Sequence, residues 1–223
     1  MGLPGSGKTT FVNECLTNGY YSFEKYSGLI DFYYKKKFYE RFINVIVNNL
    51  FNKKEYDISF HKRLSLLTIN FSNYFPNEYL KAVDFLYIFL DNGFKPNSLW
   101  LQKYFENWLF VAIAKDKKCQ FINDEGVSQR LLAVLSQTKI PKSIIVSYFQ
   151  DIDQIWYMPT NLDLSTKRLK KRERDKGLSI EELENFTSMY EDPINYVLSI
   201  EELQNKIIKL ENLEPSRFQC KGN

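Results

Sequence analysis

The sequence contains few of the residues from which metal sites and disulfide frameworks are built. Its 223 residues include one histidine, His61, and three cysteines, Cys15, Cys119 and Cys220. The cysteines are far apart and odd in number, which excludes the close pairs of a zinc site and a disulfide framework. We therefore expect reduced thiols in a cytoplasmic protein. His61 has no neighbouring acid or cysteine, so we expect a surface or half-buried residue and not a catalytic base.

Long hydrophobic runs and a strong net charge are also missing. The run LFVAIA, Leu109 to Ala114, is much shorter than the roughly 20 apolar residues of a membrane helix, and the first residues lack the pattern of a signal peptide. The net charge of +3 is too small to attract nucleic acid or a membrane in bulk. We therefore expect neither as a partner, and a chain of this length predicts one substantial domain, residues 1–223.

What the sequence does contain is a complete phosphate-loop (Walker A) motif, GLPGSGKTT, at Gly2 to Thr10. Glycines let the backbone turn with positive φ and present N–H groups to phosphate oxygens, and the helix that follows adds its positive end. Lys8 is expected to neutralise charge between the outer phosphates, and the Thr9 hydroxyl to bind Mg²⁺. The residues expected to bind the nucleotide are Gly2, Pro4, Gly5, Ser6, Gly7, Lys8, Thr9 and Thr10.

The motif lacks the strand that normally precedes it. In P-loop folds that strand is central and parallel, and Met1 alone cannot supply it. Either the full protein has residues upstream of Met1, or the chain is a shortened protein with a compromised core. We favour the first explanation, because the downstream elements look intact.

A second candidate site is the acidic pair in FINDEG, Phe121 to Gly126, which ends a predicted strand at Lys117–Asp124. A Walker B element needs an acid at the carboxyl end of a strand beside the phosphate loop, where it holds Mg²⁺ through water. Asp124 is the better candidate, with Glu125 as the alternative. The competing interpretation is an ordinary strand end whose carboxylate caps the helix at Val127.

The segment TKRLKKRERDKG, within residues 163–180, is strongly basic. Arg168 and Arg172 are four residues apart, and Lys171 and Arg174 are three apart, so each pair lies on one helical face. In a phosphoryl-transfer enzyme such cations close over the nucleotide and stabilise the transferred charge. A solvated face paired with acidic C-terminal segments is the alternative.

Apolar periodicity predicts a helix-rich middle region, residues 35–115, with Trp100 and Trp108 in its core. The predicted helices are Thr9–Asn18, Lys35–Phe51, His61–Tyr74, Asn77–Asp91, Asn97–Ala114, Gly126–Gln137, Ser179–Phe186 and a closing helix at Ser199–Leu213. Besides Lys117–Asp124, the predicted strands are Gly28–Tyr34, Gln154–Thr160 and Ile194–Leu198.

In the order of its parts the chain resembles the nucleoside and nucleoside-monophosphate kinase branch of the P-loop proteins, which includes thymidylate and adenylate kinases. The resemblance is carried by GLPGSGKTT, FINDEGVSQR and IWYMPTNLDLSTKRLKKRER. It implies a three-layer α/β/α fold with a parallel sheet. In this fold the helical region 35–115 is an insertion that contacts the substrate, and residues 163–180 are a lid-like basic segment. The residue roles that it implies are catalysis for Lys8, Arg168, Arg172 and Arg174, the metal site for Thr9, Asp124 and Glu125, and substrate contact for Gln129 and Arg130.

The function implied by this resemblance is transfer of a phosphoryl group to a small-molecule acceptor, a nucleoside or nucleotide being one class, with ATP and Mg²⁺ as cofactors. A P-loop ATPase or regulatory switch without such an acceptor is one alternative. A non-catalytic remnant that keeps the loop but has lost its strand is another. A GTPase is less favoured, because the guanine signature N-K-x-D is missing. The acceptor and the oligomeric state stay open, with a homodimer as one option.

Overall fold

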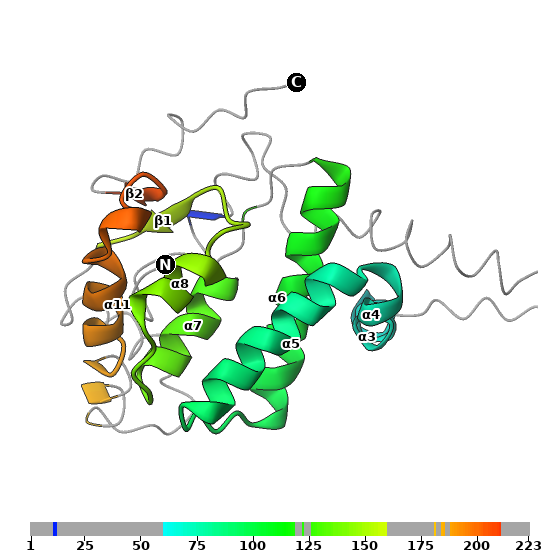
Figure 1. The fold of residues 1–223 in the computed structure, drawn as a ribbon, viewed down its shortest axis with the longest axis horizontal. Helices are drawn as coiled ribbons and strands as arrows, with labels where there is room; N and C mark the ends of the chain where they lie inside the picture. Colours follow the sequence, from blue (N-terminus) through cyan, green and yellow to red (C-terminus); the bar gives the residue numbers. More distant parts are fainter. Residues whose placement is uncertain are drawn as a thin grey trace, which may run out of the picture.

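The computed structural model describes residues 11–12, 60–118, 122, 126–159, 181, 184–185 and 188–210. This part of the chain is mostly helical and contains a small two-stranded parallel sheet (Figure 1). The helices are α3 (Phe60–Ile69), α4 (Phe71–Tyr74), α5 (Pro76–Asp91), α6 (Ser98–Lys117), α7 (Val127–Leu135), α8 (Lys142–Tyr148) and α11 (Glu191–Leu198), with a short 3-10 helix, η2 (Glu201–Leu203). The strands are β1 (Ile155–Tyr157) and β2 (Ile207–Lys209). Phe11 and Val12 are also helical.

The ends of the two longest of these helices follow from local chemistry. Pro76 occupies the first position of α5, where its missing N–H costs nothing, and Gly93 with φ of 89° turns the chain after the helix. The Asn97 side chain caps α6 by accepting a hydrogen bond of 2.8 Å from the Trp100 N–H. Lys118, with φ of 50°, ends α6 in the left-handed conformation.

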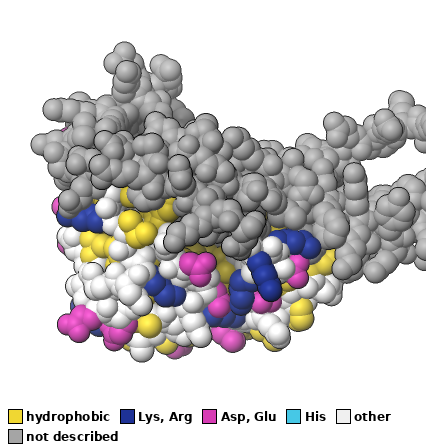
Figure 2. All heavy atoms as spheres, turned by 90° about the horizontal axis from the view of Figure 1, so that it is seen from above, with side chains coloured by type: hydrophobic (Ala, Val, Ile, Leu, Met, Phe, Trp, Pro, Cys, Tyr) yellow, Lys and Arg dark blue, Asp and Glu magenta, His cyan; other side chains and the backbone are white. Residues whose placement is uncertain are grey.

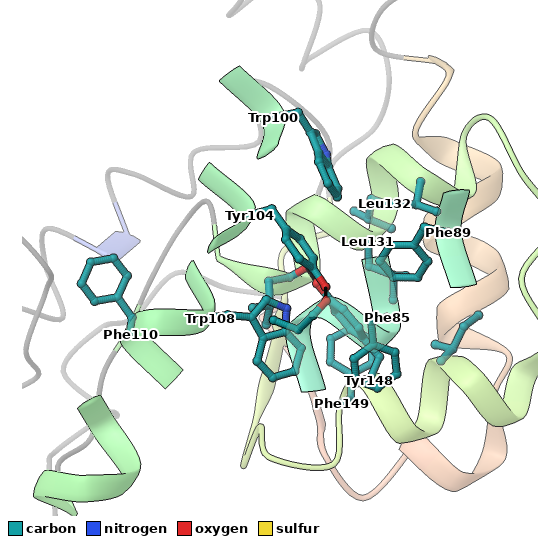
Figure 3. Close-up of a cluster of buried hydrophobic side chains, with 14 of the residues drawn as sticks. Phe85, Phe89, Trp100, Tyr104, Trp108, Phe110, Leu131, Leu132, Tyr148 and Phe149 are labelled. Carbon is teal, nitrogen blue, oxygen red and sulfur yellow. Dashed lines mark hydrogen bonds between the residues drawn. The ribbon is translucent and has the colours of Figure 1, made fainter. Parts of the chain in front are cut away.

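An aromatic cluster holds α5, α6 and α8 together (Figure 3). The Phe85 ring stacks on Trp108 with centroids 5.8 Å apart and meets Tyr148 edge-on at 5.0 Å. Both buried hydroxyls are satisfied, because Tyr104 Oη donates to the Ala82 carbonyl at 2.7 Å and Tyr148 Oη to that of Val127 at 3.1 Å. Burial raises the pKa of both tyrosines far above the ordinary value. Trp108 is fully buried and Trp100 is 8% exposed, which confirms their prediction as core residues.

The strands β1 and β2 pair in parallel, and Ile155, Trp156 and Tyr157 lie opposite Ile207, Ile208 and Lys209. The chain between them makes the crossover that parallel strands require, and this crossover includes α11. Ile155, Tyr157 and Ile207 belong to the main helical core, whereas Trp156 and Ile208 pack in a second apolar cluster. Because successive side chains of a strand point to opposite faces, the strand pair separates two apolar layers.

Most sequence-based predictions in the described helical part are confirmed. α5, α6 and α7 match the predicted helices Asn77–Asp91, Asn97–Ala114 and Gly126–Gln137 to within a few residues, and β1 lies inside the predicted strand Gln154–Thr160. The predicted helix His61–Tyr74 is divided at Asn70 into α3 and α4. Helix α8 was not predicted. None of the described helices has the length and the apolar character that crossing a membrane requires.

Two predictions near the C-terminus are wrong. Ile194–Leu198, predicted as a strand, lies in α11, where Glu191 and Asp192 in the first turn favour a helix start and Pro193 is tolerated. In place of the predicted helix at Ser199–Leu213, the described residues up to Leu210 form η2 and β2. Pairing with β1 outweighs local propensity here, because β-branched residues gain from packing on a paired strand.

The predicted strand at Lys117–Asp124 is wrong at Lys117, Lys118 and Ile122, the residues of this segment that the structure describes. Lys117 is the last residue of α6, and Lys118 forms the turn that follows. Ile122 is described and lies in neither a helix nor a strand. The remaining residues of this segment fall outside the described part of the chain.

Asp151 joins the helical part to the start of the sheet. It lies between α8 and β1, and its carboxylate contacts Lys81 Nζ on α5 at 2.7 Å and Lys115 Nζ on α6 at 3.4 Å. Lys115 also lies 3.5 Å from Glu78. Burial by itself raises the pKa of Asp151, but the hydrogen bond and charge of Lys81, together with Lys115, outweigh it and lower that pKa. Acidic and basic side chains of the described residues also lie side by side on the face shown in Figure 2.

We expect Asp151→Asn to lower the free energy of unfolding at pH 7 by about 1 kcal/mol. Because the pKa of Asp151 is lower in the folded protein than in the unfolded chain, its ionised form stabilises the fold above about pH 4, and this contribution is lost as the pH falls through the folded pKa. The difference between wild type and variant in urea unfolding should therefore shrink in acid. Asp84→Asn, at an exposed acid of α5, is the control, and a pH-independent difference would contradict the ion-pair explanation.

Candidate functional site

A small apolar cluster gathers four segments that are distant in the sequence. Phe11, Met158 and Leu210 are buried at its centre, with 3%, 4% and 6% of their surface exposed. The partly buried side chains that pack against them are those of Ile122, Trp156 and Ile208. The Phe11 ring meets Trp156 edge-on with centroids 5.5 Å apart. The residue directly after the phosphate-loop motif is therefore anchored against both strands.

The cluster extends to the carboxyl ends of the strand pair. Met158 follows the last residue of β1 and Leu210 follows the last residue of β2, and the Leu210 N–H donates to the Tyr157 carbonyl at 2.8 Å. Figure 1 shows the short blue segment that contains Phe11 beside β1. In open parallel sheets ligands bind outside the carboxyl ends of the strands. Phe11 thus lies on the face opposite the helical core, next to the strand ends where a ligand site is expected.

Most residues that the sequence assigns to the site lie outside the described part of the chain. They are Gly2, Pro4, Gly5, Ser6, Gly7, Lys8, Thr9, Thr10, Asp124, Glu125, Arg168, Arg172 and Arg174. The lid-like region 163–180 and the predicted elements Gly28–Tyr34 and Lys35–Phe51 also lie outside it. Phe11 directly follows Thr10, Ile122 comes two residues before Asp124, and Met158 comes ten residues before Arg168. These three residues are described, and the structure brings them together in one cluster.

Gln129 and Arg130, the predicted substrate contacts, lie in the first turn of α7. Their backbone N–H groups donate to the Gly126 carbonyl at 3.0 and 3.3 Å. Both side chains are half-buried, so neither lies on a fully exposed helix face. Gln129 Oε1 is buried and accepts no hydrogen bond from the described residues. A buried polar atom of this kind calls for a partner.

Arg130 also acts on the aromatic core. Burial dominates the pKa of the Tyr148 hydroxyl and raises it, and the positive charge of Arg130 opposes this increase. Tyr148 Oη in turn donates to the Val127 carbonyl, at the start of α7. The first turn of α7 is therefore held by the core while its polar side chains are only half-buried.

The structure shows site neighbours that sequence reasoning did not single out. Phe11 is the first apolar residue after the motif, and a helix that contains it is expected to pack an apolar side chain on the sheet. Trp156 lies in a predicted strand, but its face depends on the pairing register. The sequence predicts a helix at Leu210, so it gave no indication that this residue follows a strand.

The metal site predicted at Thr9, Asp124 and Glu125 lies outside the described residues. Within the described part of the chain, no group of three histidine, cysteine, aspartate or glutamate side chains could hold a metal ion. Comparison with known proteins finds no family model, no curated protein and no solved structure that matches the chain significantly. Function must therefore be inferred from the motifs and from the residues that the fold brings together.

We expect Phe11→Ala to lower the free energy of unfolding by about 3 kcal/mol, because it removes a buried ring and leaves a cavity. It should also shift the emission of Trp156, which loses its edge contact. Val12→Ala, at the next, half-buried residue, is the matched control. Equal effects of the two substitutions in urea unfolding would show that Phe11 is not anchored in this cluster.

Proposed function

We propose that the protein is a P-loop phosphotransferase that uses ATP and Mg²⁺ to phosphorylate a small-molecule acceptor. The observation that carries this proposal is the burial of Phe11, the residue directly after the GLPGSGKTT motif, against Met158 and Leu210 at the carboxyl ends of a parallel strand pair. A glycine-rich loop that leads into a helix at that edge suits a bound triphosphate.

Chain connectivity supports one shared metal site. Thr9 comes two residues before Phe11, and Asp124 comes two residues after Ile122. Two peptide units span at most about 7 Å. Because Phe11 and Ile122 belong to the same apolar cluster, both predicted magnesium ligands are tethered to it by short stretches of chain. Glu125, one residue further on, stays the alternative to Asp124.

The layering also supports a P-loop arrangement. The strand pair has the helical core on one face and the cluster of Phe11 on the other, as expected if helices cover both faces of a parallel sheet. We therefore retain the three-layer α/β/α fold, with region 35–115 as an insertion, as part of the proposal.

Each motif then has a separate chemical role. The backbone N–H groups of Gly5 to Thr10 and the ammonium of Lys8 bind the phosphates. Bound Mg²⁺ would neutralise charge on the phosphate oxygens. Arg168, Arg172 and Arg174 follow Met158 in the sequence, so the strand end at the Phe11 cluster leads into the cations that we assign to transition-state stabilisation.

The acceptor is assigned to the side of the site at the start of α7. Gln129 and Arg130 follow the acidic pair closely in the sequence and are half-buried. Gln129 Oε1 provides a buried hydrogen-bond acceptor for a hydroxyl or amino group of the substrate, and Arg130 provides a positive charge. A polar substrate that carries both a hydrogen-bond donor and a negatively charged group fits this pair best.

A nucleotide-driven ATPase or switch is the second candidate. It is favoured by the ion pairs of Asp151 with Lys81 and Lys115, which connect α5 and α6 to the residues just before β1. A conformational change at the strands would reach α5 and α6 through these ion pairs. The two candidates differ in whether an acceptor is needed for turnover.

We expect the full-length protein to bind ATP in the presence of Mg²⁺ and to change its Trp156 emission on binding, because Trp156 contacts Phe11. Lys8→Ala should weaken binding at least about tenfold, since the ammonium that neutralises the phosphates is lost. Calorimetry and fluorescence titration measure this, with Lys142→Ala at an exposed residue of α8 as control. Failure to bind any adenine or guanine nucleotide would overturn the proposal.

For a kinase, we expect rapid ATP consumption only when the correct acceptor is present in a panel of nucleosides, nucleotides and sugars. With that acceptor, Arg172→Ala should lower kcat by about 100-fold or more and leave ATP affinity nearly unchanged, because its charge acts on the transferred group. Turnover that no compound alters would favour the ATPase. Loss of thermal stability alone in Arg172→Ala would favour the interpretation as a surface ion pair.

A further inference from the structure

Lys206 uses its whole side-chain hydrogen-bonding capacity on the loop that precedes β1. Its ammonium donates to three backbone carbonyls, those of Phe149 at 2.9 Å, Gln150 at 3.0 Å and Ile152 at 2.7 Å. A lysine has three N–H donors, so all of them are satisfied by residues 149–152. Their carbonyls converge on one point and fix the path of this loop.

The backbone of Lys206 holds the next residues of the same segment. Its carbonyl accepts a hydrogen bond of 2.7 Å from the N–H of Ile155, the first residue of β1. Its own N–H donates to the Leu203 carbonyl at 2.9 Å, which ties Lys206 to η2. Lys206 directly precedes β2, so a single residue sets the start of both strands.

The register between these strands decides which side chains meet Phe11. In the observed register Trp156 and Ile208 face the Phe11 cluster, whereas Ile155, Tyr157 and Ile207 face the helical core. A slip of one residue turns every side chain of a strand to the opposite face. Each strand has only three residues, so the ladder itself provides few hydrogen bonds to resist such a slip.

We propose that Lys206 is a positioning residue for the nucleotide site, since its contacts with residues 149–155 lock the β1–β2 register that presents Trp156 and Met158 to Phe11. This inference rests on the proposed function, because it assumes that the helix of Phe11 carries the phosphate loop. Asp151, inside the same loop, is held from the other side by Lys81 and Lys115, so the loop is fixed on both sides.

A purely structural role for Lys206 makes a different prediction. Phe149 and Gln150 directly follow α8, and a cation near the carbonyls of a helix end stabilises that end. If this were its only role, loss of the ammonium would lower thermal stability without changing the nucleotide affinity of the folded protein. Affinity and the environment of Trp156 therefore separate the two roles.

The test compares Lys206→Met, which keeps the aliphatic stem, with Lys142→Met, which removes an exposed lysine of α8. ATP affinity is measured with Mg²⁺ at a temperature where each protein is folded. We expect Lys206→Met to bind ATP at least about tenfold more weakly and Lys142→Met to bind like wild type. Lys206→Arg, which keeps a charge and several donors, should recover part of the affinity. Unchanged affinity in Lys206→Met would overturn the proposal.

Trp156 emission gives a readout that does not need a ligand. It is obtained as the difference between each protein and its Trp156→Phe counterpart, and a red shift is expected in Lys206→Met as the indole leaves the cluster. If Lys206→Met shows the red shift but the wild-type protein binds no ATP, the proposed function is overturned and the role of Lys206 in fixing the strand register stands. If Lys206→Met does not fold, Lys206→Gln, which keeps an amide donor, replaces it with the same expected direction, and unchanged affinity and emission there would overturn the lock.

Discussion

The parallel pairing of β1 with β2 is the constraint on which the arrangement of the described residues depends. Parallel strands cannot be joined by a tight turn, so their pairing brings residues 155–158 and 207–210 together across a long crossover. The pair carries the main core on one face and the cluster of Phe11, Met158 and Leu210 on the other. Without this pairing, no common surface would connect Phe11, the residue after the GLPGSGKTT motif, to the strand that precedes the basic segment.

The helical part supplies the rigid body behind that sheet. Its stability comes from burial of large rings, among them Trp108, Phe85 and Tyr148, whose centroids lie 5.0 to 5.8 Å apart. Aromatic pairs contribute through area and through edge-to-face geometry, and both tyrosine hydroxyls in this core reach a backbone carbonyl. Ion pairs also connect this body to the loop before β1. There the Asp151 carboxylate pairs with Lys81. The carbonyls of residues 149, 150 and 152 in the same loop accept hydrogen bonds from the Lys206 ammonium.

The limits of sequence-based prediction lie in the short apolar segments. Long segments with helical periodicity, such as Asn77–Asp91 and Asn97–Ala114, are predicted correctly from the sequence, because apolar residues recur on one helix face over several turns. Ile194–Leu198 and Ile207–Lys209 are both short and contain β-branched residues, and nothing within either segment distinguishes the helix from the strand. The first is decided by an acidic helix start and the second by a partner strand some 50 residues earlier in the chain.

For the proposed site, the amino-acid sequence by itself determined which residue types are available for phosphate and Mg²⁺ binding. The glycine-rich motif with Lys8 and Thr9, the acidic pair and the basic segment are recognised from residue type and spacing, because the proposed phosphate and Mg²⁺ binding would require such groups. Only the tertiary structure decided that Phe11, Ile122, Met158 and Leu210 share one cluster. It also decided that Gln129 and Arg130 are half-buried. The physical reason is that burial and strand register depend on contacts between distant segments, which no local pattern encodes.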